Sequence, residues 1–512
     1  MGDFKGKYLI IRADASTQIG SGHLMRCLAL VQAWKDAGGQ VVFITACQSE
    51  GLLKRLREEG FGLHLLAHSF PESEDWSYTK GILAAHPNAW VVLDGYHFDE
   101  VYQQKVKESG HKLLVIDDMA NLKHYYADIV LNQNLHADQL QYSCDPYTRL
   151  LLGTRYVLLR KEFLAWKGWK REISEVARRV LVTLGGGDPE NYTLKVIQAL
   201  QKVDVPGLET TVVIGESNPY VDVLEAAIKQ SRIPIRLIRN AENMPELMVW
   251  ADVAVTAAGS TVWELLFLGT PILALITADN QCYVAEEIQI QNLGKSLGRA
   301  EDISIDTLTK AIALLLRDFD SRSEMCGKAR GVIDGQGTQR VISIMHATNS
   351  NNLSLRLATS EDCLMAWEWA NDPVVRAASY NSNPIAWDEH VEWFMKKLQN
   401  SNCFYYIVFS DIGLPVGQVH FDIAGNDAEI SVLIGSDFRG HDFGAEAIHI
   451  ASQRLFSETG VTRIYAHIKQ GNIASVCAFG KVGYKEIGAK VVKGQQVLEM
   501  TLEKNDGLSK DN

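Results

Sequence analysis

Short apolar runs alternate with helical patterns along the first two thirds of the chain. The runs are rich in β-branched residues, and stretches between them, such as 24–36 and 100–109, repeat apolar positions every three to four residues. This alternation predicts parallel strands joined by helices that cover both faces of a sheet. The strands predicted for the first sheet are 8–11, 41–44, 63–66, 90–93, 113–116 and 129–131.

The same alternation restarts at Arg179 and predicts a second α/β domain. Its predicted strands are 179–184, 211–214, 235–238, 253–256 and 272–276. The join at 156–175 holds aromatic and basic residues instead of a flexible Gly/Ser linker, so we expect the two domains to pack face to face around a cleft. We place these domains at 1–158 and 159–345.

A polar stretch at 346–353 predicts a linker, and the pattern after it changes to α+β. We place this third domain at 353–505. Its predicted elements are a strand at 354–357, helices at 361–371 and 387–399, strands at 404–409, 415–421 and 429–435, and a helix at 445–457.

Composition narrows the function classes. The formal net charge of −12 argues against a nucleic-acid surface or a polybasic membrane patch. No apolar run approaches the roughly 18 residues of a membrane span, and the N-terminus enters a strand pattern without a signal peptide. The eight cysteines form no CxxC pair, so we expect a cytoplasmic protein with reduced thiols and no metal site. From the charge and the apolar runs we expect neither nucleic acid nor a membrane as a partner.

The richest candidate chemistry lies at 12–27, where a strand, a Gly-Ser-Gly turn and a helix follow one another. We expect His23 at the first helical position, where the partial positive charge of the helix end favours a neutral imidazole that can accept a proton. Met25 fills the third glycine position of G-x-G-x-x-G, so a dinucleotide site is not indicated. A tight turn with a capping histidine is the alternative, but the nearby Arg12 and Asp14 favour an active site.

Polar residues follow four of the predicted strands in the first domain. Carboxyl ends of parallel strands meet at one edge of a sheet, so these residues predict a lined cleft, although turn formation alone also explains them. They are Asp14, Asp94, Tyr96, Asp117, Asp118, Asn132 and Asn134.

The second domain carries two glycine-containing strand ends, at 185–187 and at 257–260. The second of these opens a helix, and a pyrophosphate on that helix end with Glu264 accepting ribose hydroxyls would use the whole motif. Thr261 and Glu264 also fit a capping box, which needs no ligand. That alternative leaves Gly259 and the 279–281 motif unexplained.

Taken together, these motifs make residues 1–345 resemble the UDP-sugar hydrolases of the pseudaminic acid pathway. The matching motifs are Arg12-Ala13-Asp14, Gly20-x-Gly22-His23-x-Met25-Arg26-Cys27, Asp94-x-Tyr96, Asp117-Asp118, Asn132-x-Asn134, Gly259-Ser260-Thr261-x-Trp263-Glu264 and Asp279-Asn280-Gln281. The resemblance implies two Rossmann-like domains in a GT-B arrangement, with UDP on the second domain and the sugar facing the first.

It further implies that His23 is the general base, which activates water for attack at the anomeric carbon of a UDP-linked 2,4-diacetamido-2,4,6-trideoxy altrose, with inversion. Asp14 is expected to assist catalysis. The expected substrate-binding residues are Arg12, Gly22, Tyr96, Asp118, Asn134, Gly186, Gly259, Ser260, Thr261, Glu264, Asn280 and Gln281.

The third domain resembles the GCN5-related N-acetyltransferases (GNATs), through the loop and helix start at 439–445 and the Asn472 to Tyr484 segment. The resemblance implies acetyl-CoA as co-substrate and Glu429 as the base that deprotonates the amine, directly or through water; an exposed strand glutamate is the alternative. The expected acetyl-CoA-binding residues are Arg439, Gly440, His441, Phe443, Gly444, Ala445, Asn472 and Phe479. Asp442 stands where the family prefers glycine, and Phe479 stands where a tyrosine often protonates the leaving thiolate.

Together the two resemblances imply a bifunctional enzyme whose acetyltransferase acts on the 4-amino UDP-sugar that precedes the hydrolase substrate. One alternative is a GT-B glycosyltransferase with an acetyltransferase appendage, and another is a hydrolase with a non-catalytic GNAT domain. A related bacillosamine-type or spore-coat diamino sugar is a further alternative for the substrate.

Overall fold

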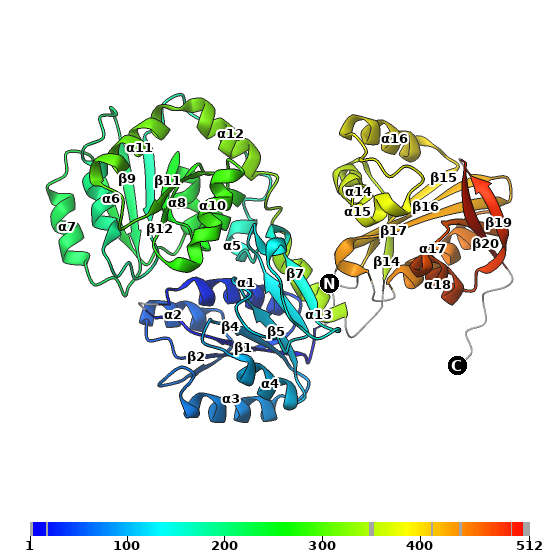
Figure 1. The fold of residues 1–512 in the computed structure, drawn as a ribbon, viewed down its shortest axis with the longest axis horizontal. Helices are drawn as coiled ribbons and strands as arrows, with labels where there is room; N and C mark the ends of the chain where they lie inside the picture. Colours follow the sequence, from blue (N-terminus) through cyan, green and yellow to red (C-terminus); the bar gives the residue numbers. More distant parts are fainter. Residues whose placement is uncertain are drawn as a thin grey trace. The chain divides into compact units, whose positions relative to one another are not determined.

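The computed structural model describes residues 4–16, 19–347, 353–410, 413–439, 443–492 and 494–504. The chain divides into two compact units, one formed by Phe4–Ile342 and the other beginning at Ser343 (Figure 1). Within the described ranges, no helix is long and apolar enough to cross a membrane.

The first sheet is parallel and has the strand order β3-β2-β1-β4-β5-β6-β7. The order reverses between β1 and β4, and open α/β sheets bind ligands at the carboxyl ends of strands beside such a switch point. Its strands are β1 Tyr8–Ala13, β2 Gln40–Thr45, β3 Gly62–Leu65, β4 Trp90–Asp94, β5 Lys112–Ile116, β6 Ile129–Asn132 and β7 Arg149–Leu152. The helices of this half are α1 Gly22–Asp36, α2 Glu50–Glu58, α3 Ser73–Ala85, α4 Glu100–Glu108 and α5 Lys161–Leu164.

The second sheet repeats this topology, with the order β10-β9-β8-β11-β12-β13 and its own switch point between β8 and β11. Its strands are β8 Arg179–Thr183, β9 Glu209–Ile214, β10 Ile235–Arg239, β11 Val253–Ala257, β12 Ile272–Ile276 and β13 Lys295–Arg299. Its helices are α6 Tyr192–Leu200, α7 Val221–Lys229, α8 Met244–Trp250, α9 Thr261–Phe267, α10 Cys282–Ile290, α11 Ile305–Arg317 and α12 Phe319–Ala329, and α13 Gly337–Ala347 follows them.

The unit that begins at Ser343 contains a mixed sheet of order β14-β15-β16-β17-β18-β20-β19, and among its described residues only β17 and β18 pair in parallel. Its strands are β14 Ser354–Leu357, β15 Cys403–Phe409, β16 Pro415–Ala424, β17 Asp427–Ile434, β18 Arg463–Lys469, β19 Lys485–Val492 and β20 Gln495–Glu503. Its helices are α14 Cys363–Ala370, α15 Pro373–Ala378, α16 Trp387–Gln399, α17 Phe443–Glu458 and α18 Ile473–Val482.

Two parallel Rossmann-like sheets followed by a mixed sheet confirm the predicted fold class. The sequence pattern missed β7, β13 and β19, each of which lies at the edge of its sheet, where one side of the strand is unpaired and the apolar signal is weaker. It also missed α3 and the neighbouring strands β18 and β20. The domain boundaries stay a prediction, and most of the predicted linker at 346–353 lies outside the described residues.

One buried histidine in the mixed sheet predicts a pH-dependent stability. His420 packs against Trp393 and Tyr405, with ring centroids at 5.8 and 5.1 Å, and burial together with Lys397 lowers its pKa from 6.5 to about 4. Between these two values the unfolded chain binds a proton that the folded chain does not. The contribution of His420 to the free energy of unfolding is therefore fully present above pH 6.5 and is lost, by roughly 3 kcal/mol, as the pH drops to 4.

Urea unfolding of the full chain, followed by tryptophan fluorescence at several pH values, measures this effect. The His420→Gln variant is expected to lose this part of the slope between pH 6.5 and 4. His449→Gln, at a half-buried position on α17, serves as the matched control. Parallel curves for wild type and His420→Gln would contradict the prediction.

Candidate active site

A cavity of about 1800 Å³ lies between the two halves of the Phe4–Ile342 unit. Its walls come from the carboxyl ends of strands in both parallel sheets and from the starts of α1 and α9. This position follows from the topology, because each sheet has its switch point there.

His23 lies on this cavity wall as the second residue of α1 and is paired with a buried carboxylate. Its Nδ1 is 2.5 Å from Oδ1 of Asp94, which ends β4. Burial opposes ionisation of Asp94, but Arg26 and His23 outweigh it and hold the pKa of Asp94 below its usual range. Because Nδ1 donates to a carboxylate, Nε2 is the ring nitrogen available as a base.

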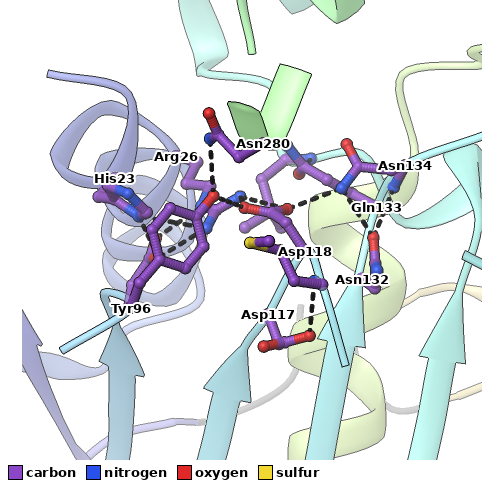
Figure 2. Close-up of polar contacts among 12 residues, drawn as sticks. His23, Arg26, Tyr96, Asp117, Asp118, Asn132, Gln133, Asn134 and Asn280 are labelled. Carbon is purple, nitrogen blue, oxygen red and sulfur yellow. Dashed lines mark hydrogen bonds and ion pairs between the residues drawn. The ribbon is translucent and has the colours of Figure 1, made fainter. Parts of the chain in front are cut away.

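Arg26 extends this pair into a charged network (Figure 2). Its Nε and Nη2 each lie 2.7 Å from an oxygen of Asp94, and its Nη1 lies 2.9 Å from both oxygens of Asp118. Despite its burial, Asp118 has a lowered pKa because Arg26 pairs with it. The Tyr96 hydroxyl and the Asn134 side-chain amide each donate to Asp118 at 2.7 Å. Four of the strand-end residues predicted to line a cleft therefore meet in one network.

Tyr96 also touches the opposite half. The Asn280 amide, which comes from the loop after β12, donates to the Tyr96 hydroxyl at 3.0 Å (Figure 2). Burial and the Asp118 charge raise the pKa of Tyr96, so its hydroxyl keeps its proton at neutral pH.

Arg12 and Asp14 do not line the cavity, which corrects the expectation that they touch substrate. Arg12 is fully buried and pairs with Asp14 and Asp75, and Asp14 also accepts a hydrogen bond from the Ala46 amide. Asp14 reaches the cavity through His97, whose Nε2 is 3.1 Å from its carboxylate. The pair therefore supports the cavity wall from behind.

The second sheet contributes the predicted nucleotide-facing residues. Gly186, Gly259, Ser260, Thr261, Glu264, Asn280 and Gln281 all line the cavity. The two helix starts approach closely, since a Cβ on Gly22 would lie 3.0 Å from Oγ of Ser260. Glycine at position 22 therefore lets the halves meet beside His23.

Glu264 does not form the capping box that was the alternative to a ligand site. α9 begins at Thr261 with Ser260 as its N-cap, one residue earlier than a box on Thr261 and Glu264 requires, and no side chain caps it. Glu264 instead accepts from Nη2 of Arg160 at 2.8 Å. Burial raises the pKa of Glu264, and Arg160 partly offsets that effect.

A second contact joins the halves at the start of α2. The Glu216 carboxylate, which follows β9, accepts from the Gly51 amide and from the Ser49 hydroxyl. A Cβ on Gly51 would lie 2.5 Å from Nδ2 of Asn240 and 2.7 Å from Oε2 of Glu216. A side chain at 51 would therefore require the ends of the Asn240 and Glu216 side chains to shift.

Gly215 supports the Gly186 loop and yields a testable expectation. A Cβ at this position would lie 2.5 Å from the carbonyl oxygen of Gly186 and 2.7 Å from its Cα, and backbone atoms cannot move aside cheaply. Gly215→Ala is expected to displace the cavity-lining loop and to weaken binding of the UDP that the resemblance predicts for this half about tenfold, or about 1.4 kcal/mol.

Titration calorimetry with UDP measures this change. Gly327→Ala is the control, because a Cβ there meets nothing within 4 Å. Equal UDP affinities for the two variants would contradict the expectation.

In the unit that begins at Ser343, β17 and β18 separate beyond their first residues. Their parallel pairing ends at Glu429 and Tyr465, although the strands continue to Ile434 and Lys469. A notch therefore opens between two neighbouring strands, with Glu429 half exposed at its start. The separation leaves backbone groups of both strands available to an extended ligand.

Most residues predicted to bind acetyl-CoA have structural partners. The Arg439 side chain binds the Ile434 carbonyl and Asp372, and Asn472 caps α18. Phe443 and Phe479 are buried against Phe438 and Tyr484, respectively. Gly444 and Ala445 lie in the first turn of α17, whereas Gly440, His441 and Asp442 lie outside the described residues.

Four contributors to these sites were not among the predicted catalytic or binding residues: Arg26, His97, Arg160 and His467. Asp94 was predicted to line the cleft, because it ends an apolar strand as Asp14 does, but not to pair with His23. The pairings of His97 and Arg160 join positions 83 and 104 residues apart in the chain, which no local pattern reveals.

Comparison with known proteins agrees with this division of the chain. Residues 180–336 match the glycosyltransferase family 28 C-terminal domain, and residues 352–485 match the acetyltransferase (GNAT) domain. An uncharacterized protein of Methanocaldococcus jannaschii is 25% identical over 499 residues, covering 95% of this chain and 98% of the relative.

Two relatives match the first unit. The spore coat polysaccharide biosynthesis protein SpsG of Bacillus subtilis is 24% identical over 337 residues, covering 65% of this chain and 96% of that protein. The UDP-2,4-diacetamido-2,4,6-trideoxy-beta-L-altropyranose hydrolase of Campylobacter jejuni is 27% identical over 276 residues, covering 53% of this chain and 93% of that protein. These matches confirm the resemblance to that hydrolase and the fusion to a GNAT domain.

Proposed function

We propose that the Phe4–Ile342 unit hydrolyses UDP-2,4-diacetamido-2,4,6-trideoxy-beta-L-altropyranose to UDP and the free sugar. We further propose that the GNAT unit acetylates the 4-amino precursor of that UDP-sugar. The observation that carries the first proposal is the pairing of His23 with the buried carboxylate of Asp94 on the cavity wall. The hydrolase name of the Campylobacter jejuni relative supports the choice of substrate.

In this mechanism Nε2 of His23 takes a proton from water as the water oxygen attacks the anomeric carbon. The bond from that carbon to the diphosphate oxygen breaks, UDP leaves with the electron pair, and the configuration inverts. Asp94 keeps the ring in the required tautomer and stabilises the imidazolium that forms. Asp14 acts behind the wall as a positioning residue for His97.

The sugar is oriented from the first sheet and the nucleotide is held by the second. Tyr96, Asp118 and Asn134 present hydroxyl, carboxylate and amide groups that match acetamido and hydroxyl substituents. On the other side, Gly186 and the start of α9 offer backbone amides to the diphosphate, and Glu264 offers a carboxylate to the ribose hydroxyls.

The GNAT unit fits acetyl-CoA in part. The notch between β17 and β18 suits an extended chain, and Gly444 lies in the first turn of α17, where a Cβ would make ordinary contact with Ile434 and Ala478 at 3.8 and 3.9 Å. When bound, acetyl-CoA supplies the activated acetyl group, and Glu429 takes the proton of the amine. Phe479 cannot donate a proton to the leaving sulfur, so water fills that role.

A mass-spectrometric assay in ¹⁸O-water tests both proposals with the full chain. The 4-amino UDP-sugar is supplied with and without acetyl-CoA. UDP release and ¹⁸O in the free diacetamido sugar, both only with acetyl-CoA, are expected, and EDTA is expected to leave the rates unchanged. Acetylation without UDP release would overturn the hydrolase proposal and favour a glycosyltransferase. Hydrolysis of preacetylated substrate without any acetylation would overturn the acetyltransferase proposal.

A further inference from the structure

A histidine lies between two carboxylates at the start of the notch in the mixed sheet. Nδ1 of His467 on β18 is 3.0 Å from Oε1 of Glu429 on β17, and its Nε2 is 3.0 Å from Oε1 of Glu499 on β20. In the tautomer with the proton on Nε2, that nitrogen donates to Glu499, and Nδ1 can accept from Glu429 once this carboxylate is protonated. The three side chains form a continuous hydrogen-bonded path along the sheet.

The path runs from an exposed end to a covered one. The side chain of Glu429 is 54% exposed, that of His467 only 9% and that of Glu499 18%. Lys490 of β19 donates to Glu499 at 3.0 Å, and the bonds from His467 and Lys490 lower the pKa of Glu499. The far end of the path therefore stays ionised, while the near end faces the notch.

The other charged and titratable groups around the path have their own partners. Asp422 of β16, opposite Glu429 in the ladder, pairs with Lys397 at 2.5 Å. The hydroxyl of Tyr465 on β18 accepts from Arg463 at 2.8 Å. Burial and the Glu429 charge raise the pKa of Tyr380, so this phenol stays protonated beside the carboxylate.

We propose that His467 is a positioning residue that relays the proton taken up by Glu429 from the acceptor amine onward to Glu499. The inference rests on the proposed acetylation. It specifies the path by which the proton that Glu429 takes from the amine leaves the site. A lone glutamate that accepts a proton must release it before the next turnover. His467 provides an exit that does not cross the bound acceptor.

The atoms of the reaction balance along this route. The acceptor ammonium loses one proton to Glu429, its nitrogen bonds to the acetyl carbon of acetyl-CoA, and the carbon–sulfur bond breaks. The sulfur leaves with the electron pair and takes the second nitrogen proton through water. The first proton passes from Glu429 to Nδ1 of His467 as the Nε2 proton moves to Glu499, and from there to solvent.

The experiment compares Glu499→Gln with Glu503→Gln in the full chain. Glu503 is the matched control, because it lies on the same strand and pairs with Arg463 of β18. The pH profile of kcat for acetylation is measured for each variant, and the titration of the His467 ring is followed by ¹³C NMR of the free protein. The His467→Gln variant assigns the ring resonance.

Glu499→Gln is expected to lower the plateau of kcat about tenfold, which corresponds to one lost proton-transfer partner. The ¹³C signal of the His467 ring and the acid limb of the pH profile of kcat are both expected to differ from wild type, because an anion beside the ring is removed. The KM for acetyl-CoA is expected to stay unchanged, and Glu503→Gln is expected to behave as wild type.

The outcomes separate this inference from the function beneath it. If wild type acetylates and the two glutamine variants share one pH profile, the relay is overturned while the acetyltransferase proposal stands. If the NMR data for the His467 ring are the same in wild type and in Glu499→Gln, the relay is overturned whatever the activity. If wild type acetylates nothing at any pH, the acetyltransferase proposal fails and the relay fails with it.

Discussion

Replacing His23 by asparagine is expected to lower kcat for UDP release by about 10²- to 10⁴-fold, the usual contribution of a general base. Asparagine keeps a polar group near Asp94 but cannot take a proton from water. The affinity for UDP is expected to persist, because the nucleotide-facing residues lie on the second sheet. Single-turnover release of UDP and calorimetric titration of UDP measure the two quantities separately.

His68→Asn is the matched control for this variant. His68 is an exposed histidine on the wall of the same cavity, so its loss changes the lining without touching the His23–Asp94 pair. If His23→Asn kept more than a tenth of wild-type kcat, the proposed base would be wrong. A parallel loss of UDP affinity would instead point to a binding role.

The second large effect is expected for Asp94→Asn. The neutral amide cannot stabilise the imidazolium of His23, and it leaves Arg26 with one carboxylate instead of two. We expect kcat to fall by about 10²- to 10⁴-fold and the free energy of unfolding to fall by on the order of 3 kcal/mol, since one member of a buried ion-pair network is lost. Kinetics at saturating substrate and urea unfolding measure the two effects.

Asp117→Asn separates stability from catalysis. Asp117 is also a buried carboxylate at the end of a neighbouring strand, but it bonds to Tyr125, Tyr142 and the backbone of the following turn. Asp117→Asn is expected to lower the free energy of unfolding while leaving most of kcat unchanged.

The His23→Asn/Asp94→Asn double variant is expected to be about as slow as His23→Asn alone, because the two residues act as one unit. Fully multiplicative losses would refute that pairing.

The first domain shows what a single sequence reveals about a site. The strand-end positions of Tyr96, Asp118 and Asn134 follow from alternating apolar runs, and topology alone brings them to one edge. Their mutual hydrogen bonds depend on side-chain directions that the pattern does not encode. The polar residue types at the strand ends therefore predicted that a cleft lies there. They did not predict that Arg26 bridges Asp94 and Asp118.

Buried charge is where the sequence reasoning went wrong. Arg12 and Asp14 belong to the most polar motif of the chain, yet their charges neutralise each other beneath the wall. Arg160 lies in a segment with no recognisable motif, yet it pairs with Glu264, the carboxylate predicted to face the ribose. Whether a charged side chain faces a ligand or another charge depends on partners distant in sequence.

Gly51 does not line the cleft, but substitutions at this position are expected to change the width of the cleft. A side chain at 51 must displace the ends of the Glu216 and Asn240 side chains, and a large one is expected to push the halves apart. A graded series of alanine, valine and phenylalanine at this position would yield enzymes that differ in how far they close, with every substrate-facing residue intact. Comparing kcat across that series would show how much of the turnover time is spent in closing the cleft and how much in the chemical step.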